Sequence, residues 1–287
     1  MASVKDLRGR IRSLKNTQQI TKAMKQVAAA KIRRAETAQK QARPYADALG
    51  EMLQDLIATS SRIDHPFMNP GKAGAPPGVI LMTADKGLAG AFNSNVIREA
   101  ERYWRQRSDA RFYTVGIKAR NAVRRWGLGD RPGWPLNAPS KLQTAHELAQ
   151  NVTEDFTAGE IGEIVLVSSK HVSMMVQRPE MRQLVPIERE TAAAPSTGPR
   201  GSVEIEPSPE FVLSKLLPKY LEFTLFSAML ETDASFYAAQ LLAMNNATEN
   251  AGKLIDELTI AMNNARQAAI TKELLEIVSG AEALTGT

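Results

Sequence analysis

The sequence predicts an α/β protein in which long N- and C-terminal helices form an antiparallel coiled coil beside a small doubly wound α/β domain. Three observations lead to this prediction. Glycine and proline are rare at both ends of the 287-residue chain and frequent in its middle. Apolar residues recur with heptad spacing near the carboxy terminus. In the middle, short apolar runs alternate with helical patterns.

Helix-breaking residues divide the chain into three parts. No proline precedes Pro44, and none follows Pro218. Long segments without proline are compatible with unbroken helices. We therefore expect a coiled-coil helix over residues 1–59, a globular α/β domain over 60–210 and a second coiled-coil helix over 211–287.

The carboxy-terminal helix carries an apolar stripe in alternating steps of three and four residues. The stripe consists of Leu241, Met244, Thr248, Ala251, Ile255, Leu258, Met262, Ala265 and Ala269. This spacing predicts a left-handed coiled-coil seam, and its small residues predict a slender rod. The amino-terminal helix has one stripe from Val4 to Leu14 and a second, offset stripe of Ile20, Met24 and Val27. Because the middle domain joins the far ends of the two helices, we expect them to pack antiparallel.

The middle section alternates between strand and helix patterns. Strands are expected at 78–82, 111–115, 163–167 and 182–188, and helices at 96–104, 119–126 and 142–156. This alternation predicts a small parallel sheet of the doubly wound, Rossmann-like type. Residues 191–209 are rich in proline and glycine and are expected to form an exposed loop.

Positive charge is concentrated at the amino-terminal end. Residues 1–43 contain twelve Lys or Arg and two acids, whereas the remainder contains 24 basic and 29 acidic side chains (36 − 12 and 31 − 2). Five cations each follow a seam-phase position by one residue and so form a line along the helix: Lys5, Arg8, Arg12, Lys15 and Lys22. A solvated flank usually mixes both signs, so this line predicts an acidic partner surface. The alternatives are an anionic membrane face, the solvated flank of an ordinary coiled coil, and a nucleic acid. The lack of aromatic residues between the cations disfavours the nucleic acid.

The composition excludes several kinds of site. The chain has no cysteine, which excludes disulfides, thiolate metal sites and cysteine nucleophiles. Its three histidines are scattered along the sequence. We expect neither a metal nor a cofactor. The amino terminus lacks the apolar core of a secretory signal, and no stretch approaches the roughly 18 apolar residues of a membrane span.

One turn lies where a dinucleotide-binding fold places its phosphate loop. Residues 83–96 (TADKGLAGAFNSNV) follow the first expected strand and lead into a helix. The glycines Gly87 and Gly90 fit neither a GxGxxG loop nor a loop that ends in Gly-Lys-Ser/Thr. A nucleotide-binding enzyme built on the middle domain therefore remains only an alternative.

The same turn contains the acid–base pair Asp85 and Lys86, on which no further catalytic residue converges in the sequence. We expect no active site here. The simpler interpretation is a tight strand-to-helix turn in which Asn93 or Ser94 caps the following helix.

The carboxy-terminal end of the last helix leaves the seam register. Its apolar residues Ile270, Leu274, Ile277 and Val278 are out of phase with the seam, and the amino-terminal helix is too short to cover them. An apolar helix end buries itself against another surface. That surface is either the chain's own domain or a partner.

Three blocks of sequence resemble a known family. They are residues 11–31 (IRSLKNTQQITKAMKQVAAAK), the stretch from 243–251 (AMNNATENA) through 265–281 (ARQAAITKELLEIVSGA), and the turn 85–95 (DKGLAGAFNSN). In this order they are similar to the gamma subunit of rotary F-type ATP synthases, the central stalk. The resemblance extends over essentially the whole chain.

The resemblance implies a noncatalytic rotor with no cofactor. Its shaft would turn inside a hexamer of alternating alpha and beta subunits, and its foot would rest on the c-ring beside the epsilon subunit. It would couple proton translocation to ATP synthesis or hydrolysis. The implied location is peripheral, on the cytoplasmic face of the bacterial inner membrane, with membrane contact only through the c-ring and with no nucleic acid partner.

The resemblance also implies contacts for particular residues of the two long helices. Lys22, Met24 and Lys25 match the neck segment that faces an acidic loop of the beta subunits. Arg266 and Gln267 match a pair that hydrogen-bonds a beta subunit higher in the bore.

Two further regions match by position. Phe226 lies in the foot region that meets the epsilon subunit. The segment held in the upper bearing of the hexamer corresponds here to Leu274, Ile277, Val278 and Leu284.

The chain departs from the family pattern near the neck. Phe236 and Gln240 stand where the family often has a glutamate and an arginine, so the usual polar network near Met24 is not expected. Lys86 replaces a common arginine and Ala89 a frequent cysteine, and both changes are mild.

Overall fold

The structure is a computed structural model that forms two compact units, one of residues 1–27 and 241–287 and the other of residues 28–240. It describes residues 3–59, 65–129, 131–187, 206 and 208–285, except the side chains of 58, 59, 209 and 282–285. The helices α1 (Val4–Thr59) and α6 (Pro209–Thr285) each contribute to both units. The expected domains 1–59, 60–210 and 211–287 stay a prediction. Their boundaries differ from those of the compact units, because the first unit combines segments from both ends of the chain and the second is the continuous segment between them.

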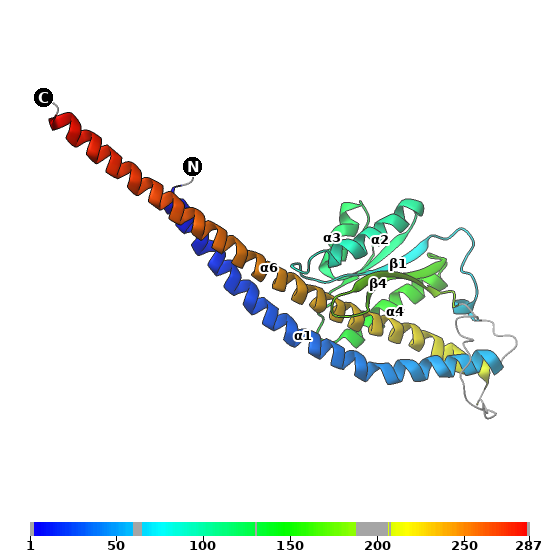
Figure 1. Cartoon of the computed structure of the whole chain (residues 1–287). Helices are drawn as coiled ribbons and strands as arrows, with labels where there is room; N and C mark the ends of the chain where they lie inside the picture. Colours follow the sequence, from blue (N-terminus) through cyan, green and yellow to red (C-terminus); the bar gives the residue numbers. More distant parts are fainter. Residues whose placement is uncertain (1–2, 60–64, 130, 188–205, 207, 286–287) are drawn as a thin grey trace. The chain divides into compact units, whose positions relative to one another are not determined.

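The first unit is the expected antiparallel helix pair (Figure 1). On α6 the seam positions from Leu241 to Ala265 are all buried or half-buried, and Met244, Ala251 and Ile255 are the most buried of them. The heptad spacing therefore predicted this side of the seam correctly as far as Ala265. The last expected seam residue, Ala269, is wrong: it is exposed, because α6 here continues past the amino-terminal end of α1. Small side chains at Ala251 and Ala265 are compatible with a close approach of the two helix axes.

The seam on α1 differs from the expectation in its second half. It keeps a single heptad phase from Leu7 and Ile11 onward, and Thr21 is buried in it. The second, offset apolar stripe is wrong, because Ile20 is 60% and Val27 is 55% exposed. The polar residue Thr21 can occupy a buried seam position because its hydroxyl is hydrogen-bonded. A hydrogen-bonded hydroxyl costs little free energy to bury.

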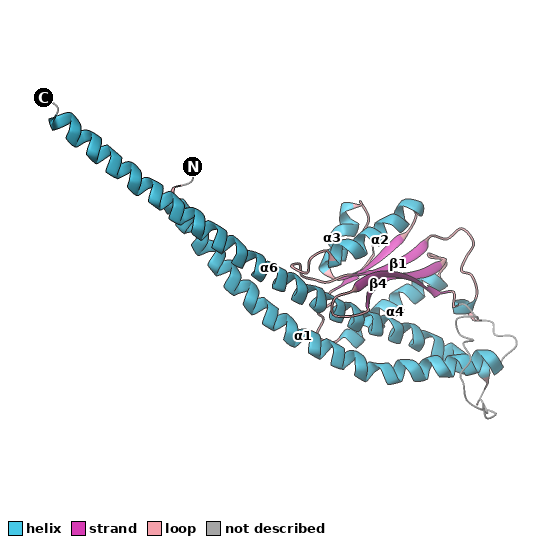
Figure 2. Cartoon of the chain, viewed as in Figure 1, coloured by secondary structure: helices cyan, strands magenta, loops and turns pink. Residues whose placement is uncertain are grey.

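The second unit contains a five-stranded sheet in the order β3-β2-β1-β4-β5 (Figure 2). The strands are β1 (Pro77–Met82), β2 (Arg111–Val115), β3 (Gly133–Trp134), β4 (Glu163–His171) and β5 (Gln177–Val185). The first four are mutually parallel, as expected for a doubly wound sheet. The short strand β3 was not predicted, since two residues carry no periodic signal.

Strand β5 corrects the bounds of the further strand expected at 182–188 and departs from the parallel order of the sheet. It begins at Gln177 and runs antiparallel to β4. The connection is a tight turn in which the amide of Val176 donates to the carbonyl of Ser173 at 3.2 Å. So short a connection produces a hairpin, because a parallel return needs a crossover of about a dozen residues or more. Residue 188 and most of the expected loop at 191–209 lie outside the described residues.

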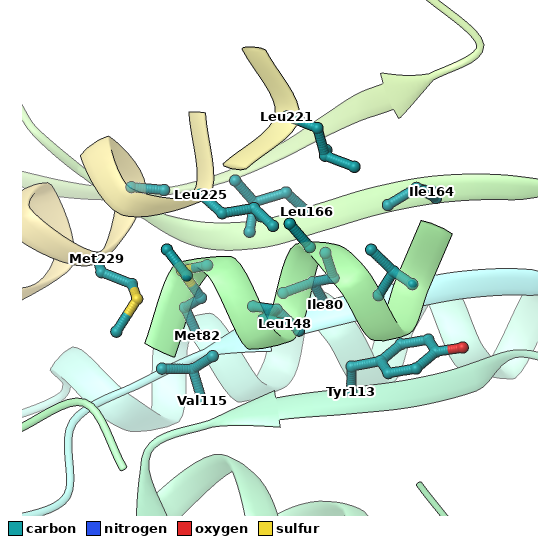
Figure 3. Close-up of a cluster of buried hydrophobic side chains, with 14 of the residues drawn as sticks. Ile80, Met82, Tyr113, Val115, Leu148, Ile164, Leu166, Leu221, Leu225 and Met229 are labelled. Atoms are coloured by element: carbon teal, nitrogen blue, oxygen red, sulfur yellow. The ribbon is translucent and has the colours of Figure 1, made fainter. Parts of the chain in front are cut away.

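Helices cover both faces of the sheet within this unit. One face packs against α2 (Phe92–Gln106) and α3 (Ile117–Arg125), and the other against α4 (Lys141–Thr157) and parts of α1 and α6. Side chains alternate along β1 accordingly: Val79 faces the first layer and Ile80 the second. Figure 3 shows Ile80, Leu148 of α4 and Leu225 of α6 as members of one buried cluster. The second face is the larger core of the unit.

Candidate functional site

The turn after β1 is held by the carboxylate of Asp85. Its Oδ1 accepts hydrogen bonds from the amides of Ile117 at 3.0 Å and Leu136 at 3.2 Å, and its Oδ2 accepts one from Asn137 at 2.8 Å. Ile117 is the first residue of α3. The carboxylate of Asp85 thus lies at the amino-terminal end of α3, which is a kind of position where a bound phosphate would otherwise sit. Asp85 joins three backbone segments and acts as an internal anion.

A second set of contacts closes the turn against the start of α3. The hydroxyl of Thr83 accepts from the amide of Ala119 at 2.7 Å. Gly116 has φ of +95°, and a Cβ at this position would lie 2.0 Å from the carbonyl oxygen of Thr83. Only glycine satisfies both this backbone conformation and this close approach.

The amide side chain of Asn93 also belongs to the turn. Its Oδ1 accepts from the backbone of Ala84 at 3.0 Å, and its Nδ2 donates to the carbonyl of Lys86 at 3.1 Å. The expectation that Asn93 or Ser94 caps the helix is wrong, because the N-cap is Ala91 and makes no side-chain hydrogen bond. Asn93 instead lies inside α2 and holds the backbone on both sides of Asp85.

These contacts show how residues 85–95, which we call the signature turn, use their polar groups. Asp85 and Asn93 are engaged by backbone groups of the same unit, and Lys86 is exposed. The geometry disfavours the nucleotide-binding alternative, since the carboxylate of Asp85 would repel a phosphate at the start of α3.

The three expected neck residues differ in exposure within the helix-pair unit. Lys25 lies in the seam, and its Nζ donates to Oδ1 of Asn245 at 2.5 Å. Met24 is half-buried and Lys22 is exposed. Lys22 therefore continues the line of exposed cations, whereas Lys25 contributes to the pairing of the two helices. The line itself is confirmed as an exposed set: Lys5, Arg8, Arg12, Lys15 and Lys22.

The carboxy-terminal part of α6 has an uncovered apolar surface. Every residue from Arg266 to Ala281, including Gln267, is exposed, and α6 continues past the amino-terminal end of α1 in this unit (Figure 1). Ile277 is 68% exposed, the highest value among the large apolar residues of this segment. The expected bearing residues Leu274 and Val278 share this exposure. Leu284 lies in α6, and its side chain is outside the described part of the structure.

The expected foot residue Phe226 is half-buried at the edge of the larger core. Its ring centroid lies 5.4 Å from that of Phe223, which in turn lies 4.5 Å from that of Tyr45 of α1. The structure thus assigns Phe226 a packing role within its own unit.

The departure at Phe236 is explained by packing. Phe236 is buried, and its ring lies 5.8 Å from that of Phe92 at the start of α2 and 5.1 Å from that of Tyr237. An apolar residue at this position therefore fills the interface between α6 and the signature turn. Gln240 is also buried.

A group of polar residues near this interface was not predicted from the sequence. Lys141 lies 3.2 Å from Asp233, and Lys31 donates to the hydroxyl of Tyr237 at 3.4 Å. Lys31 and Tyr237 are 206 residues apart, so no local pattern connects them. The only sequence signal was that charged and polar residues occur in a helical stretch that is otherwise apolar.

Comparison with known proteins identifies the family. A family model described as ATP synthase matches residues 3–284. The ATP synthase gamma chain of Desulforamulus reducens is 44% identical over 285 residues, which cover 99% of this chain and 100% of that protein. That of Phenylobacterium zucineum is 44% identical over 291 residues, with 99% and 100% covered. This chain belongs to the ATP synthase gamma chain family. The resemblance stated from the sequence is thereby confirmed.

Solved structures related to the gamma chain family share its fold. A chain of the Euglena gracilis mitochondrial ATP synthase matches with a TM-score of 0.66 at 18% identity, covering 98% of this chain and 94% of that one. A chain of the Tetrahymena thermophila central stalk and c-ring matches with a TM-score of 0.61 at 23% identity, covering 79% and 99%. In the described part of this gamma chain family member, no helix combines the length and apolarity needed to cross a membrane.

Proposed function

We propose that this chain is the central-stalk rotor of an F-type ATP synthase. It transmits rotation between the membrane c-ring and the catalytic alpha/beta hexamer, and so couples proton translocation to ATP synthesis or hydrolysis. The observation that carries the proposal is the slender helix pair with its bare carboxy-terminal end, in a chain that matches ATP synthase gamma chains over its whole length.

The chain itself is noncatalytic in this proposal, and the catalytic sites lie on the beta subunits. The geometry of the signature turn supports this view, because Asp85 and Asn93 are engaged in backbone contacts. No cofactor is needed for a subunit that acts by mechanical contact.

The neck of the rotor meets the acidic loop of the beta subunits through Lys22, Met24 and Lys25. The exposed line of cations that ends at Lys22 supports this contact, since like charges along one helix face repel each other until an acidic surface neutralises them. Lys25 acts here mainly by holding α1 against α6, through its hydrogen bond to Asn245.

The upper part of α6 is held inside the hexamer. Arg266 and Gln267 hydrogen-bond a beta subunit, and the bearing contains Leu274, Ile277, Val278 and Leu284. Removal of apolar surface from water is favourable by about 25 cal/mol per Å², before the costs of association. The exposed apolar residues of this segment are therefore expected to be covered in the assembled enzyme.

The foot of the rotor is the sheet-containing unit. It rests on the c-ring and meets the epsilon subunit near Phe226, with membrane contact only through the c-ring. The complex is placed on the cytoplasmic face of a bacterial inner membrane, as a peripheral assembly. The relatives from Desulforamulus reducens and Phenylobacterium zucineum are bacterial, which supports this location.

The proposal is tested by reconstituting the synthase in sealed vesicles with and without this chain. ATP hydrolysis should acidify the vesicle interior only when the chain is present. Equal proton pumping by complexes that lack the chain would contradict the proposal.

A further inference from the structure

A polar cluster joins both long helices to the sheet inside the unit of residues 28–240. We call it the junction cluster; its members are Lys31 of α1, Asp85 of the signature turn, Asn137, Lys141 of α4, and Asp233 and Tyr237 of α6. None of these residues is among the contact residues proposed above. The cluster connects segments that are distant in the sequence.

An ion pair forms the first part of the cluster. Nζ of Lys141 lies 3.2 Å from Oδ2 of Asp233, and the two side chains are only 17% and 12% exposed. Lys141 is the first residue of α4, where the helix dipole disfavours a cation. The carboxylate of Asp233 accounts for a lysine at this unfavourable position.

A chain of hydrogen bonds forms the second part. Lys31 donates to the hydroxyl of Tyr237 at 3.4 Å and lies 5.1 Å from the centre of its ring. The hydroxyl of Tyr237 donates to Oδ1 of Asn137 at 3.4 Å, and the backbone amide of Asn137 donates to Asp85 at 2.8 Å. Asp85 also holds the first amide of α3. This chain of hydrogen bonds therefore links α1 and α6 to the signature turn, which follows β1.

The electrostatic environment indicates that this cluster does not serve mainly to stabilise the fold. Burial raises the pKa of the Asp233 carboxyl, and the attraction of Lys141 and Lys31 offsets this only in part. Buried ion pairs of this kind contribute little to stability, and apolar residues of similar volume often replace them without loss. An ion pair instead fixes the orientation of the elements that carry it, because its hydrogen bonds require a defined distance and angle, whereas apolar packing is non-directional.

We infer that the junction cluster fixes the rotational setting of α1 and α6 against the sheet, so that torque passes between the helices and the foot without slip. The inference rests on the rotor function proposed above. Without the cluster, the helices would remain packed through the apolar core but would turn more freely against α4 and the signature turn. Lys141 and Asp233 are thus positioning residues for coupling.

The test replaces the ion pair by apolar residues of similar size, in the double variant Lys141→Met/Asp233→Leu of the complete synthase. Because the pair contributes little to stability, we expect assembly and ATP hydrolysis within about twofold of the unaltered enzyme. Protons pumped per ATP hydrolysed should fall below the ratio of the unaltered enzyme. A merely structural role would instead lower assembly and hydrolysis together and leave this ratio unchanged, which would overturn the inference.

Three further variants make the result specific. Lys219→Ala removes the ion pair of Lys219 with Glu222, which lies within α6 alone, and should leave the ratio unchanged. The exchanged pair Lys141→Asp/Asp233→Lys should recover about half of the lost ratio or more, as expected for two directly interacting residues. Failure of the exchange to improve on the apolar variant would contradict a directional role.

Tyr237→Phe keeps the aromatic ring and removes only the hydroxyl, so it tests the cluster even if the double variant does not assemble. We expect a smaller but measurable loss of pumping per ATP, and no loss would contradict the inference. Proton pumping by complexes with and without the unaltered chain is measured in parallel. This comparison separates the rotor function from the role of the junction cluster. If pumping needs the chain but is insensitive to these variants, the rotor function stands and the junction cluster has no part in it.

Discussion

The hydroxyl groups of Thr21 and Thr248 lie 2.8 Å apart across the seam of the helix pair, with Thr248 as the donor. The hydroxyl of Thr21 in turn donates to the carbonyl of Gln18 at 3.1 Å. The seam therefore contains a paired polar layer where a stronger coiled coil would place leucine or isoleucine. Such a layer fixes the register of the two helices and keeps their axes close.

The close packing of the seam predicts that it does not tolerate larger residues. Ala251 is buried in the seam, so Ala251→Leu should destabilise the chain by about 1–3 kcal/mol through overpacking. Ala269→Leu, at an exposed position of the same helix, is the matched control and should have little effect. Urea unfolding followed by circular dichroism measures both. Equal midpoints would show that the seam is looser than the structure implies.

The junction between β2 and α3 requires glycine at position 116. Gly116→Ala should destabilise the chain by roughly 2 kcal/mol or more, because φ is +95° and the new Cβ would collide with the carbonyl of Thr83. Gly9→Ala provides the opposite control, since nothing lies within 4 Å of its position in α1. That change should stabilise the chain by about 0.5–1 kcal/mol. Thermal unfolding should give a lower melting temperature for Gly116→Ala and a higher one for Gly9→Ala than for the unaltered chain. A Gly116→Ala protein as stable as the unaltered chain would contradict the geometry at position 116.

The carboxylate of Asp85 is predicted to hold the signature turn together. Asp85→Ala leaves the amides of Ile117, Leu136 and Asn137 without their acceptor and should cost about 2–4 kcal/mol of folding stability. The exposed Asp109, which forms an ion pair with Arg107 at 3.5 Å, is the control, and its replacement by Ala should cost less than about 0.5 kcal/mol. Hydrogen exchange at the three amides should increase only in the first variant. Unchanged exchange would rule out this role of Asp85.

The raised pKa of Tyr237 predicts that the chain loses folding stability at alkaline pH. Burial, with the nearby charges of Asp233 and Asp85, raises its pKa to about 12 from an ordinary value of 10.0. The pKa of Tyr237 is higher in the folded chain than in the unfolded chain. The protonated hydroxyl of Tyr237 therefore contributes fully to folding stability below pH 10, and this contribution is lost as the pH rises through about 12. Tyr237→Phe should therefore lose less stability than the unaltered chain over this interval. The free energy of unfolding of both proteins is measured at a series of alkaline pH values, with the tyrosinate absorbance as monitor. An equal loss of unfolding free energy in the two proteins would contradict the prediction.

Arg266 is expected to matter for coupling more than an arginine on the sheet-containing unit. Arg266 is exposed in the isolated chain and is proposed to form a charge-assisted hydrogen bond to a beta subunit. Within the residues that the structure describes, Arg107 forms surface ion pairs, at 3.5 Å to Asp109 and 3.6 Å to Glu163. Arg266→Ala should therefore reduce ATP-driven proton pumping by about tenfold and Arg107→Ala by less than about twofold. Similar losses in both variants would refute the assignment of Arg266.

Periodic features of the fold could be predicted from the sequence because each depends on neighbouring residues. Heptad steps located Met244, Ala251 and Ile255 in the seam, and short apolar runs located the three central strands. The same reasoning failed for Ile20 and Val27, because it counts apolar residues and cannot see that a buried threonine is satisfied by a partner on another helix.

Relationships between distant residues could not be predicted. The direction of β5 depends on a tight turn at Ser173, which carries no glycine or proline signal. The pairs Lys141–Asp233 and Lys31–Tyr237 exist only after α1, α4 and α6 have packed around the sheet. Candidate contact residues came from similarity to a family, and they remain predictions about surfaces that the isolated chain leaves open.

The most direct test of the central claim is observation of rotation in single molecules. The chain has no cysteine, so Met175→Cys at a 73% exposed position gives one attachment point for a bead on the sheet-containing unit. With the alpha/beta hexamer fixed to a surface and ATP supplied, the bead should turn continuously in one direction. A bead that stays stationary while the same complexes hydrolyse ATP would contradict the account.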